Sequence, residues 1–134
     1  MALTIYGKNK PAPHGGANKS EFRLVSVNRR WGAITFNQCT VRELGMETGM
    51  KVLFANDEDT NAWYFSFGSD DEIKDGSKLR ENGSTMRTQN RLVSARILTK
   101  IDKERATFNV SQFPLREDGK EWWKILIKTP YRIV

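Results

Sequence analysis

The sequence has little of the chemistry on which most enzymes depend. Its 134 residues include one cysteine, Cys39, and one histidine, His14. A lone cysteine excludes an internal disulfide and favours a reducing, cytoplasmic setting. A lone histidine supports neither a Ser–His–Asp triad nor a Cys–His pair, and it has no second metal ligand nearby. Phosphate-binding glycine motifs are also missing. We therefore predict a protein that is not an enzyme and has no metal and no cofactor.

Long apolar runs are absent as well. No stretch approaches the ~20 consecutive apolar residues that a membrane-spanning helix needs. The first residues lack the charged and apolar regions of a signal peptide. The acidic runs at 57–59 and 70–72 do not follow the EF-hand pattern and are interpreted as solvated turns. We expect no membrane partner.

Positive charge is what the chain has in excess. Its 22 Lys and Arg outnumber its 16 Asp and Glu, which gives a net charge of +6. Residues 57–72 hold six acids and no base, whereas the segments on either side are both basic. Two basic segments around an acidic one suit a surface that binds a polyanion on one side. The charge pattern favours DNA or RNA as the partner, and the alternative is a soluble domain with ordinary solvated charges.

Residues 22–67 have the pattern of a ββαββ unit. The Thr40–Glu43 stretch matches a capping box, in which a hydroxyl and a carboxylate satisfy free amides at a helix start. Gly45 is expected to end this helix, because glycine enters the left-handed conformation without a steric penalty. Apolar and polar residues alternate on both sides of the helix, as they do in half-buried strands. The predicted strands are residues 22–28, 33–37, 51–55 and 62–67.

Residues 77–128 repeat this plan after an acidic linker at 68–76. Asn90 is expected to cap a helix that runs through residues 91–100. Residues 114–120 have the composition of a polar turn. The predicted strands of this second unit are residues 78–82, 84–88, 106–111 and 122–128.

Each unit would leave one apolar sheet face uncovered, and two units can bury these faces together. We therefore predict a mainly β (α+β) fold, in which two pseudo-repeated ββαββ units form one small barrel or sandwich with two short helices. The predicted boundaries are a mobile basic arm over residues 1–21 and a single domain over residues 22–134.

The turn, helix and following strand of the first unit carry a motif. A basic turn leads to a G-x-I-T-(I/F) stretch, a short helix ending in L-G, and a G-x-x-V stretch; the matching positions are Gly32, Ile34, Thr35, Phe36, Val41, Leu44, Gly45, Gly49 and Val52. Over residues 25–56 the chain resembles the AbrB/SpoVT swapped-hairpin domain of bacterial transition-state regulators and antitoxins. Asn37 stands where that family usually has Pro, and Met50 stands where it usually has Asp.

Members of that family pair as dimers and bind DNA through basic residues on the hairpin side. The resemblance implies DNA contacts at Arg23, Arg29 and Arg30, in a bacterial or phage protein. If the second unit is a diverged copy, one chain imitates the dimer internally as a cradle-loop barrel. Lys78, Arg80 and Arg87 are then the topological counterparts in the second unit.

The strongest cluster is Arg29-Arg30-Trp31, at the tip of a predicted hairpin. Arginine offers a planar fork for phosphate oxygens or a guanine edge, and tryptophan offers a stacking face for an unpaired base. The alternative is that Trp31 folds back onto the sheet. Trp122 and Lys124 form a second aromatic and basic stripe, on the strand face opposite an inward Trp123. The alternative there is a second buried face.

These observations predict a non-enzymatic protein that binds DNA, single- or double-stranded, through a basic and aromatic surface. The alternative is a structural or protein–protein interaction module, such as a phage virion or assembly component. The sequence leaves open whether the chain is a monomer with an internal pseudo-dimer or a homo-oligomer. The predicted nucleic-acid contacts are Arg23, Arg29, Arg30, Trp31, Lys78, Arg80, Arg87, Trp122 and Lys124.

Overall fold

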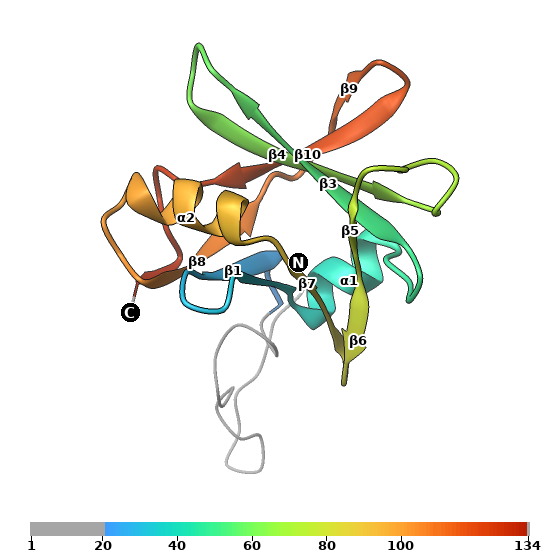
Figure 1. Ribbon diagram of the computed structural model, residues 1–134, viewed down its shortest axis with the longest axis horizontal. Helices are drawn as coiled ribbons and strands as arrows, with labels where there is room; N and C mark the ends of the chain where they lie inside the picture. The colour runs from blue at the N-terminus through green and yellow to red at the C-terminus, as the bar shows by residue number, and fades with distance from the viewer. Residues whose placement is uncertain (1–20, 134) are drawn as a thin grey trace, which may run out of the picture.

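The structure is a computed structural model, and it describes residues 21–133. This part of the chain contains eleven short strands and two helices (Figure 1). This confirms a mainly β protein with two short helices. The helices are α1 (Gln38–Leu44) and α2 (Arg91–Thr99). The strands are β1 (Leu24–Asn28), β2 (Ala33–Phe36), β3 (Lys51–Asp57), β4 (Ala62–Gly68), β5 (Ser77–Lys78), β6 (Arg80–Asn82), β7 (Thr85–Gln89), β8 (Arg105–Val110), β9 (Leu115–Glu117), β10 (Lys120–Leu126) and β11 (Arg132–Ile133).

The strands form one antiparallel sheet that curls into a nearly closed barrel. Its order is β5-β3-β4-β10-β8-β1-β2-β7-β6, with β9 attached to β10 and β11 attached to β8. The two ends of this order are β5, which pairs with β3, and β6, which pairs with β7. In the chain only Leu79 separates β5 from β6. Leu79 is buried in the core, and its amide donates to the Met50 carbonyl at 2.9 Å. The predicted strand over 78–82 is therefore two short strands, β5 and β6, on either side of the buried Leu79.

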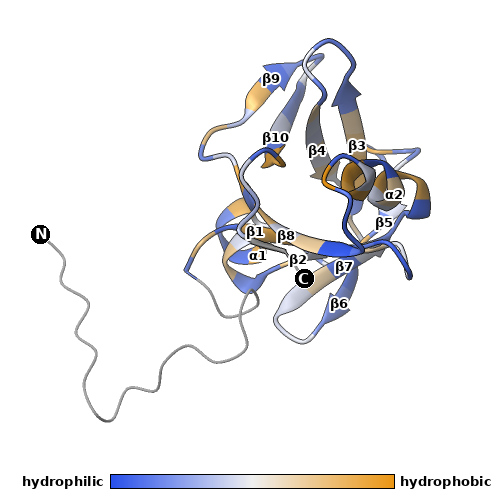
Figure 2. Ribbon diagram, turned by 90° about the vertical axis from the view of Figure 1, so that its left-hand side faces the viewer, coloured by the Kyte–Doolittle hydropathy of each residue, from blue (hydrophilic) through white to orange (hydrophobic). Residues whose placement is uncertain are grey.

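Alternation along the strands builds the core of the barrel (Figure 2). Val25 of β1 lies between Phe36 of β2 and Phe108 of β8, and all three side chains are buried. The Phe36 ring also contacts Phe65 of β4, with ring centroids 4.9 Å apart. Because successive side chains point to opposite faces, the residues between these positions face outward.

The start of α1 differs from the prediction. The capping box at Thr40–Glu43 is wrong, because Asn37 is the N-cap and its side chain accepts from the Thr40 amide at 3.0 Å. The same oxygen accepts from the Leu24 amide of β1 at 3.0 Å. Asn37 thus satisfies a helix end and a strand at once, which a capping box confined to the helix cannot do. Gly45 ends the helix in the left-handed conformation, as predicted.

Asn90 caps α2, as predicted, and accepts from the Val93 amide at 3.1 Å. The polar turn predicted over 114–120 is wrong in part, because residues 115–117 form β9 and pair with the start of β10. Within the predicted linker, Ile73 is buried. The predicted N-terminal arm lies outside the described residues except at residue 21. Neither helix in residues 21–133 is long and apolar enough to cross a membrane.

Candidate nucleic-acid interface

The outer face of five neighbouring strands carries two rows of residues in register. In one row, each residue pairs with the next across β6, β7, β2, β1 and β8. The second row lies two residues along each strand, toward the β1–β2 turn. None of these residues is acidic. We define the basic face by both rows together: Arg80, Arg87, Thr35, Ser26 and Thr107, followed by Gln89, Ala33, Asn28 and Arg105.

Arg80 and Arg87 stand directly opposite each other on β6 and β7. They share a cleft of about 250 Å³ with Lys78, and no acidic residue lines it. The two ion pairs among the described residues, Arg23–Glu43 and Lys51–Asp70, leave all three of these cations unpaired. Like charges directly opposite in a sheet destabilise it. The fold therefore gathers three cations in one place, and none of them forms an ion pair within the described residues.

The β1–β2 turn is held in one conformation by its own side chains. The Asn28 side-chain oxygen accepts from the backbone amides of Arg30 at 3.0 Å and Trp31 at 3.4 Å. The Arg30 guanidinium lies 5.1 Å from the centroid of the Trp31 ring, within the range of a cation–π contact. Trp31 is 55% exposed and so does not fold back onto the sheet.

Gly32 docks this turn against the start of α2. Its φ is +66°, a conformation that residues with a Cβ rarely adopt. A Cβ here would also lie 2.6 Å from the Arg91 Cγ and 2.9 Å from the Arg91 Cα. The Gly32 carbonyl accepts from the Asn90 amide at 2.8 Å. The turn thus sits at the end of the basic face, in a fixed position.

Two of the predicted contacts, Arg23 and Arg29, are engaged within the fold. Arg23 pairs with Glu43 at 2.7 Å, and its guanidinium lies 5.3 Å from the centroid of the Trp123 ring. Arg29 points toward the C-terminal turn of α2, where its Nη2 lies 3.4 Å from the Thr99 hydroxyl. Neither guanidinium belongs to the basic face.

Trp122 and Lys124 lie beyond the β8 edge of the basic face. They belong to β10, which β8, β1 and β2 separate from β7 in the strand order. Trp122 is half-buried and pairs with Leu115, and exposed Lys124 pairs with Tyr64. The structure therefore brings together Lys78, Arg80 and Arg87, places Arg30 and Trp31 at the end of the same face, and separates Arg23, Arg29, Trp122 and Lys124 from it.

Arg105 is a residue of the basic face that the sequence interpretation missed. It pairs with Asn28 at the first position of β8 and is exposed. Thr107 and Asn109 were predicted to face outward, and continuing this alternation two residues toward the N-terminus would have predicted that Arg105 also faces outward. Gln89 was missed for the same reason, since it follows Arg87 on the outer face of β7.

Cys39 has the wrong environment for a nucleophile. Its side chain is buried, and this burial, with a hydrogen bond to Glu43, raises the pKa of the thiol. A protonated thiol is a poor nucleophile. In the described part of the chain, no three His, Cys, Asp or Glu residues lie close enough to hold a metal ion. No family model, curated protein sequence or solved structure matches this chain.

Proposed function

We propose that this protein binds nucleic acid, without enzymatic activity, through the basic face. The observation that carries this proposal is the register of Arg80 opposite Arg87, with Lys78 in the same cleft. Without a ligand, the two guanidinium groups repel each other. A phosphate between them removes the repulsion and accepts hydrogen bonds from both arginines. Neutralised phosphates also release counterions, which supplies much of the affinity for nucleic acid.

The middle of the basic face suits an extended polyanion. Only small side chains, Ala33, Thr35, Ser26 and Asn28, separate Arg87 on β7 from Arg105 on β8. Three strand spacings set the width between these arginines at roughly 14 Å. A nucleic-acid strand can lie over this low surface and contact arginines on both sides.

The proposal covers single- and double-stranded DNA, and Trp31 favours the single strand. Stacking needs an unpaired base and an exposed ring, and Trp31 is 55% exposed at the end of the face. Arg30, against the same ring, adds a cation for a neighbouring phosphate. Strand preference therefore depends on Trp31, whereas the arginines of the face contribute to both forms.

The strand order supports a second part of the proposal, that the two predicted units are copies of one ββαββ unit. Exchanging β1, β2, β3 and β4 with β6, β7, β8 and β10 turns the pair β1–β2 into β6–β7 and the pair β3–β4 into β8–β10. The pairs β2–β7 and β4–β10 exchange into themselves. The pair β1–β8 becomes β6–β3, two strands that β5 joins. This pseudo-two-fold order is what an AbrB-like dimer contained in one chain would have.

Fluorescence anisotropy of labelled single- and double-stranded DNA, titrated at several salt concentrations, tests the proposal. We expect Arg87→Gln to weaken binding and to lower the slope of log K against log salt by about one. The matched control is Arg116→Gln on β9, which lies outside the basic face and should leave both unchanged. If neither DNA binds at low salt, or if both variants lose affinity equally, the basic face is not the site.

Arg87→Gln should have the opposite effect on stability. Because it removes a cross-strand repulsion, it should raise the free energy of unfolding by a few tenths of a kcal/mol (about 0.2–1). A gain in stability together with a loss of affinity is the signature of a residue placed for a ligand. Urea denaturation of the free protein measures the first effect.

The second candidate function is a structural or interaction module, and exposed apolar side chains favour it. Phe113 is 76% exposed next to β9, and Leu115 of β9 is 47% exposed. Light scattering coupled to size-exclusion chromatography separates the candidates. An internal pseudo-dimer should be a monomer, whereas an assembly component should form defined oligomers.

A further inference from the structure

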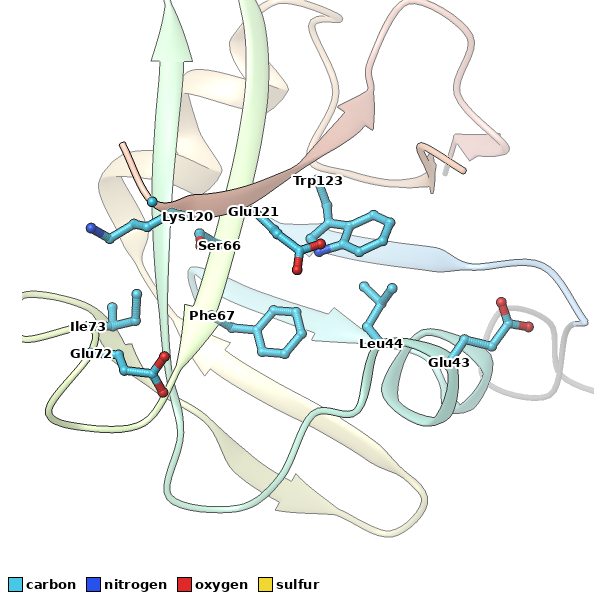
Figure 3. Close-up of a pocket in the computed structure, with 10 residues that line it drawn as sticks. Glu43, Leu44, Ser66, Phe67, Glu72, Ile73, Lys120, Glu121 and Trp123 are labelled. Carbon is cyan, nitrogen blue, oxygen red and sulfur yellow. The ribbon is translucent and has the colours of Figure 1, made fainter. Parts of the chain in front are cut away.

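A cavity opens where β10 separates from β4 (Figure 3). β10 pairs with β4 only from Trp123 to Ile125, and its first residues pair with β9 instead. β4 continues to Gly68 without β10 beside it. The gap holds a volume of about 580 Å³.

The walls of this cavity are aromatic and its rim is acidic. Half-buried Trp123 and Phe67 line it, together with Leu44 at the end of α1 (Figure 3). The lining also includes three carboxylates, Glu43, Glu72 and Glu121, and a single base, Lys120. In Figure 3 the Glu121 carboxylate lies between Phe67 and Trp123, and the Lys120 ammonium points away from both rings. Glu43 is paired with Arg23, so Glu72 and Glu121 against Lys120 leave this lining with a net negative charge, on a protein whose own net charge is +6.

Hydrogen bonds favour the ionised form of two of these carboxylates. Hydrogen bonds from Cys39 and Arg23 lower the pKa of Glu43, and hydrogen bonds from the Ser69 hydroxyl and amide lower the pKa of Glu72. Glu121 makes no hydrogen bond or ion pair with another described residue. Arg116 stands opposite it on β9 without forming an ion pair with it.

The Trp123 ring already accepts a cation within the fold. The Arg23 guanidinium lies 5.3 Å from its centroid. Aromatic faces attract cations through their quadrupole, and the attraction grows when the cation is partly desolvated. This cavity provides an aromatic face for a cation, and its two aromatic walls partly desolvate the cation next to the carboxylates.

We infer that this cavity binds a lysine or arginine side chain from a basic peptide segment of a partner protein. The cation enters between Phe67 and Trp123 and faces the Glu121 carboxylate. Charge complementarity identifies the partner, because a nucleic acid or another anionic ligand would meet the carboxylates of Glu72 and Glu121 here. The site lies at the β4–β10 gap, away from the basic face, so this inference does not rest on the proposed function.

The test uses a fluorescein-labelled peptide, Gly-Arg-Gly-Arg-Gly, and the full chain in low salt. Its control is the same peptide with citrulline in place of arginine, which keeps the shape and removes the charge. We expect the arginine peptide to bind and the citrulline peptide to bind at least about ten-fold more weakly. Equal binding of the two peptides, or no binding of either, overturns the inference.

Variants of the cavity locate the site. Glu121→Gln should weaken the arginine peptide about three-fold, and Phe67→Leu, which keeps the apolar volume, should weaken it by a similar factor. Glu58→Gln in the exposed β3–β4 turn, outside the cavity lining, is the matched control and should change nothing. Equal losses in Glu121→Gln and Glu58→Gln would mean general attraction to acidic residues and would refute the site. DNA binding should be the same in all these variants.

Discussion

Replacing Gly32 with alanine should destabilise the fold in two ways, and a comparison with Gly83→Ala separates their free-energy costs. The first is conformational, because φ is +66°. The second is steric, because the new Cβ would lie 2.9 Å from both the backbone nitrogen and the Cα of Arg91. Backbone atoms cannot rotate away as a side chain can. Either the turn or the start of α2 must move.

Gly83, in the β6–β7 turn, carries the first cost alone. Its φ is +65°, and nothing lies within 4 Å of a Cβ built there. A left-handed conformation costs an alanine roughly 1–2 kcal/mol, and overpacking adds about 1–3 kcal/mol. Gly32→Ala should therefore destabilise the protein by about 3 kcal/mol and Gly83→Ala by about 1 kcal/mol. The loss of freedom in the unfolded chain is the same for both variants and cancels in the difference.

Urea denaturation measures both variants. With a slope of roughly 1.5 kcal/mol per molar urea, the expected difference of ~2 kcal/mol separates their midpoints by about 1.3 M. Midpoints within about 0.3 M of each other would show that the turn does not press on α2 and would refute the steric argument. Because Gly32 also places Trp31, Gly32→Ala should lower the affinity for single-stranded DNA.

Two further changes test the α1 end of the barrel. Asn37→Ala leaves the buried Leu24 amide without its acceptor and should cost about 2–4 kcal/mol in unfolding free energy. Asn90→Ala, at the less buried cap of α2, should cost about 1 kcal/mol. Equal losses would contradict the conclusion that Asn37 satisfies both α1 and the Leu24 amide. Hydrogen bonds from the Cys39 thiol and from Arg23 lower the pKa of Glu43, so the ionised carboxylate stabilises the fold above its ordinary pKa of 4.5, and this contribution is lost as pH falls through the lower folded-state pKa. Glu43→Gln should thus cost under about 1 kcal/mol at pH 7, with the difference from wild type shrinking in urea melts near pH 3, and a constant difference would exclude this pairing.

The basic face could be anticipated only in part. The charge of Arg80 and Arg87 and the strands that carry them are local features of the sequence. Their position opposite each other depends on the register of β6 with β7 and on the buried Leu79 between β5 and β6. Arg23 shows the converse. It was predicted to contact DNA, but Glu43, twenty residues away, and the Gln112 carbonyl, 89 residues away, engage its guanidinium.

Local pattern determined most of the elements. Alternating apolar residues predicted the strands of the core, Asn90 predicted the start of α2, and Gly45 predicted the end of α1. These signals are local because the side-chain period and the capping hydrogen bonds involve residues close together in the chain.

Tertiary structure decided the rest. It selected Asn37 over Thr40 as the cap of α1, divided residues 77–82 between two strand partners around Leu79, and turned residues 115–117 into β9. In each case the residue or strand that makes the deciding contact lies on a distant segment of the chain. Burial selects this contact, because certain apolar faces and backbone amides must be buried together. A sequence pattern shows that a face is apolar or an amide needs an acceptor. Only the folded barrel determines which other segment meets it.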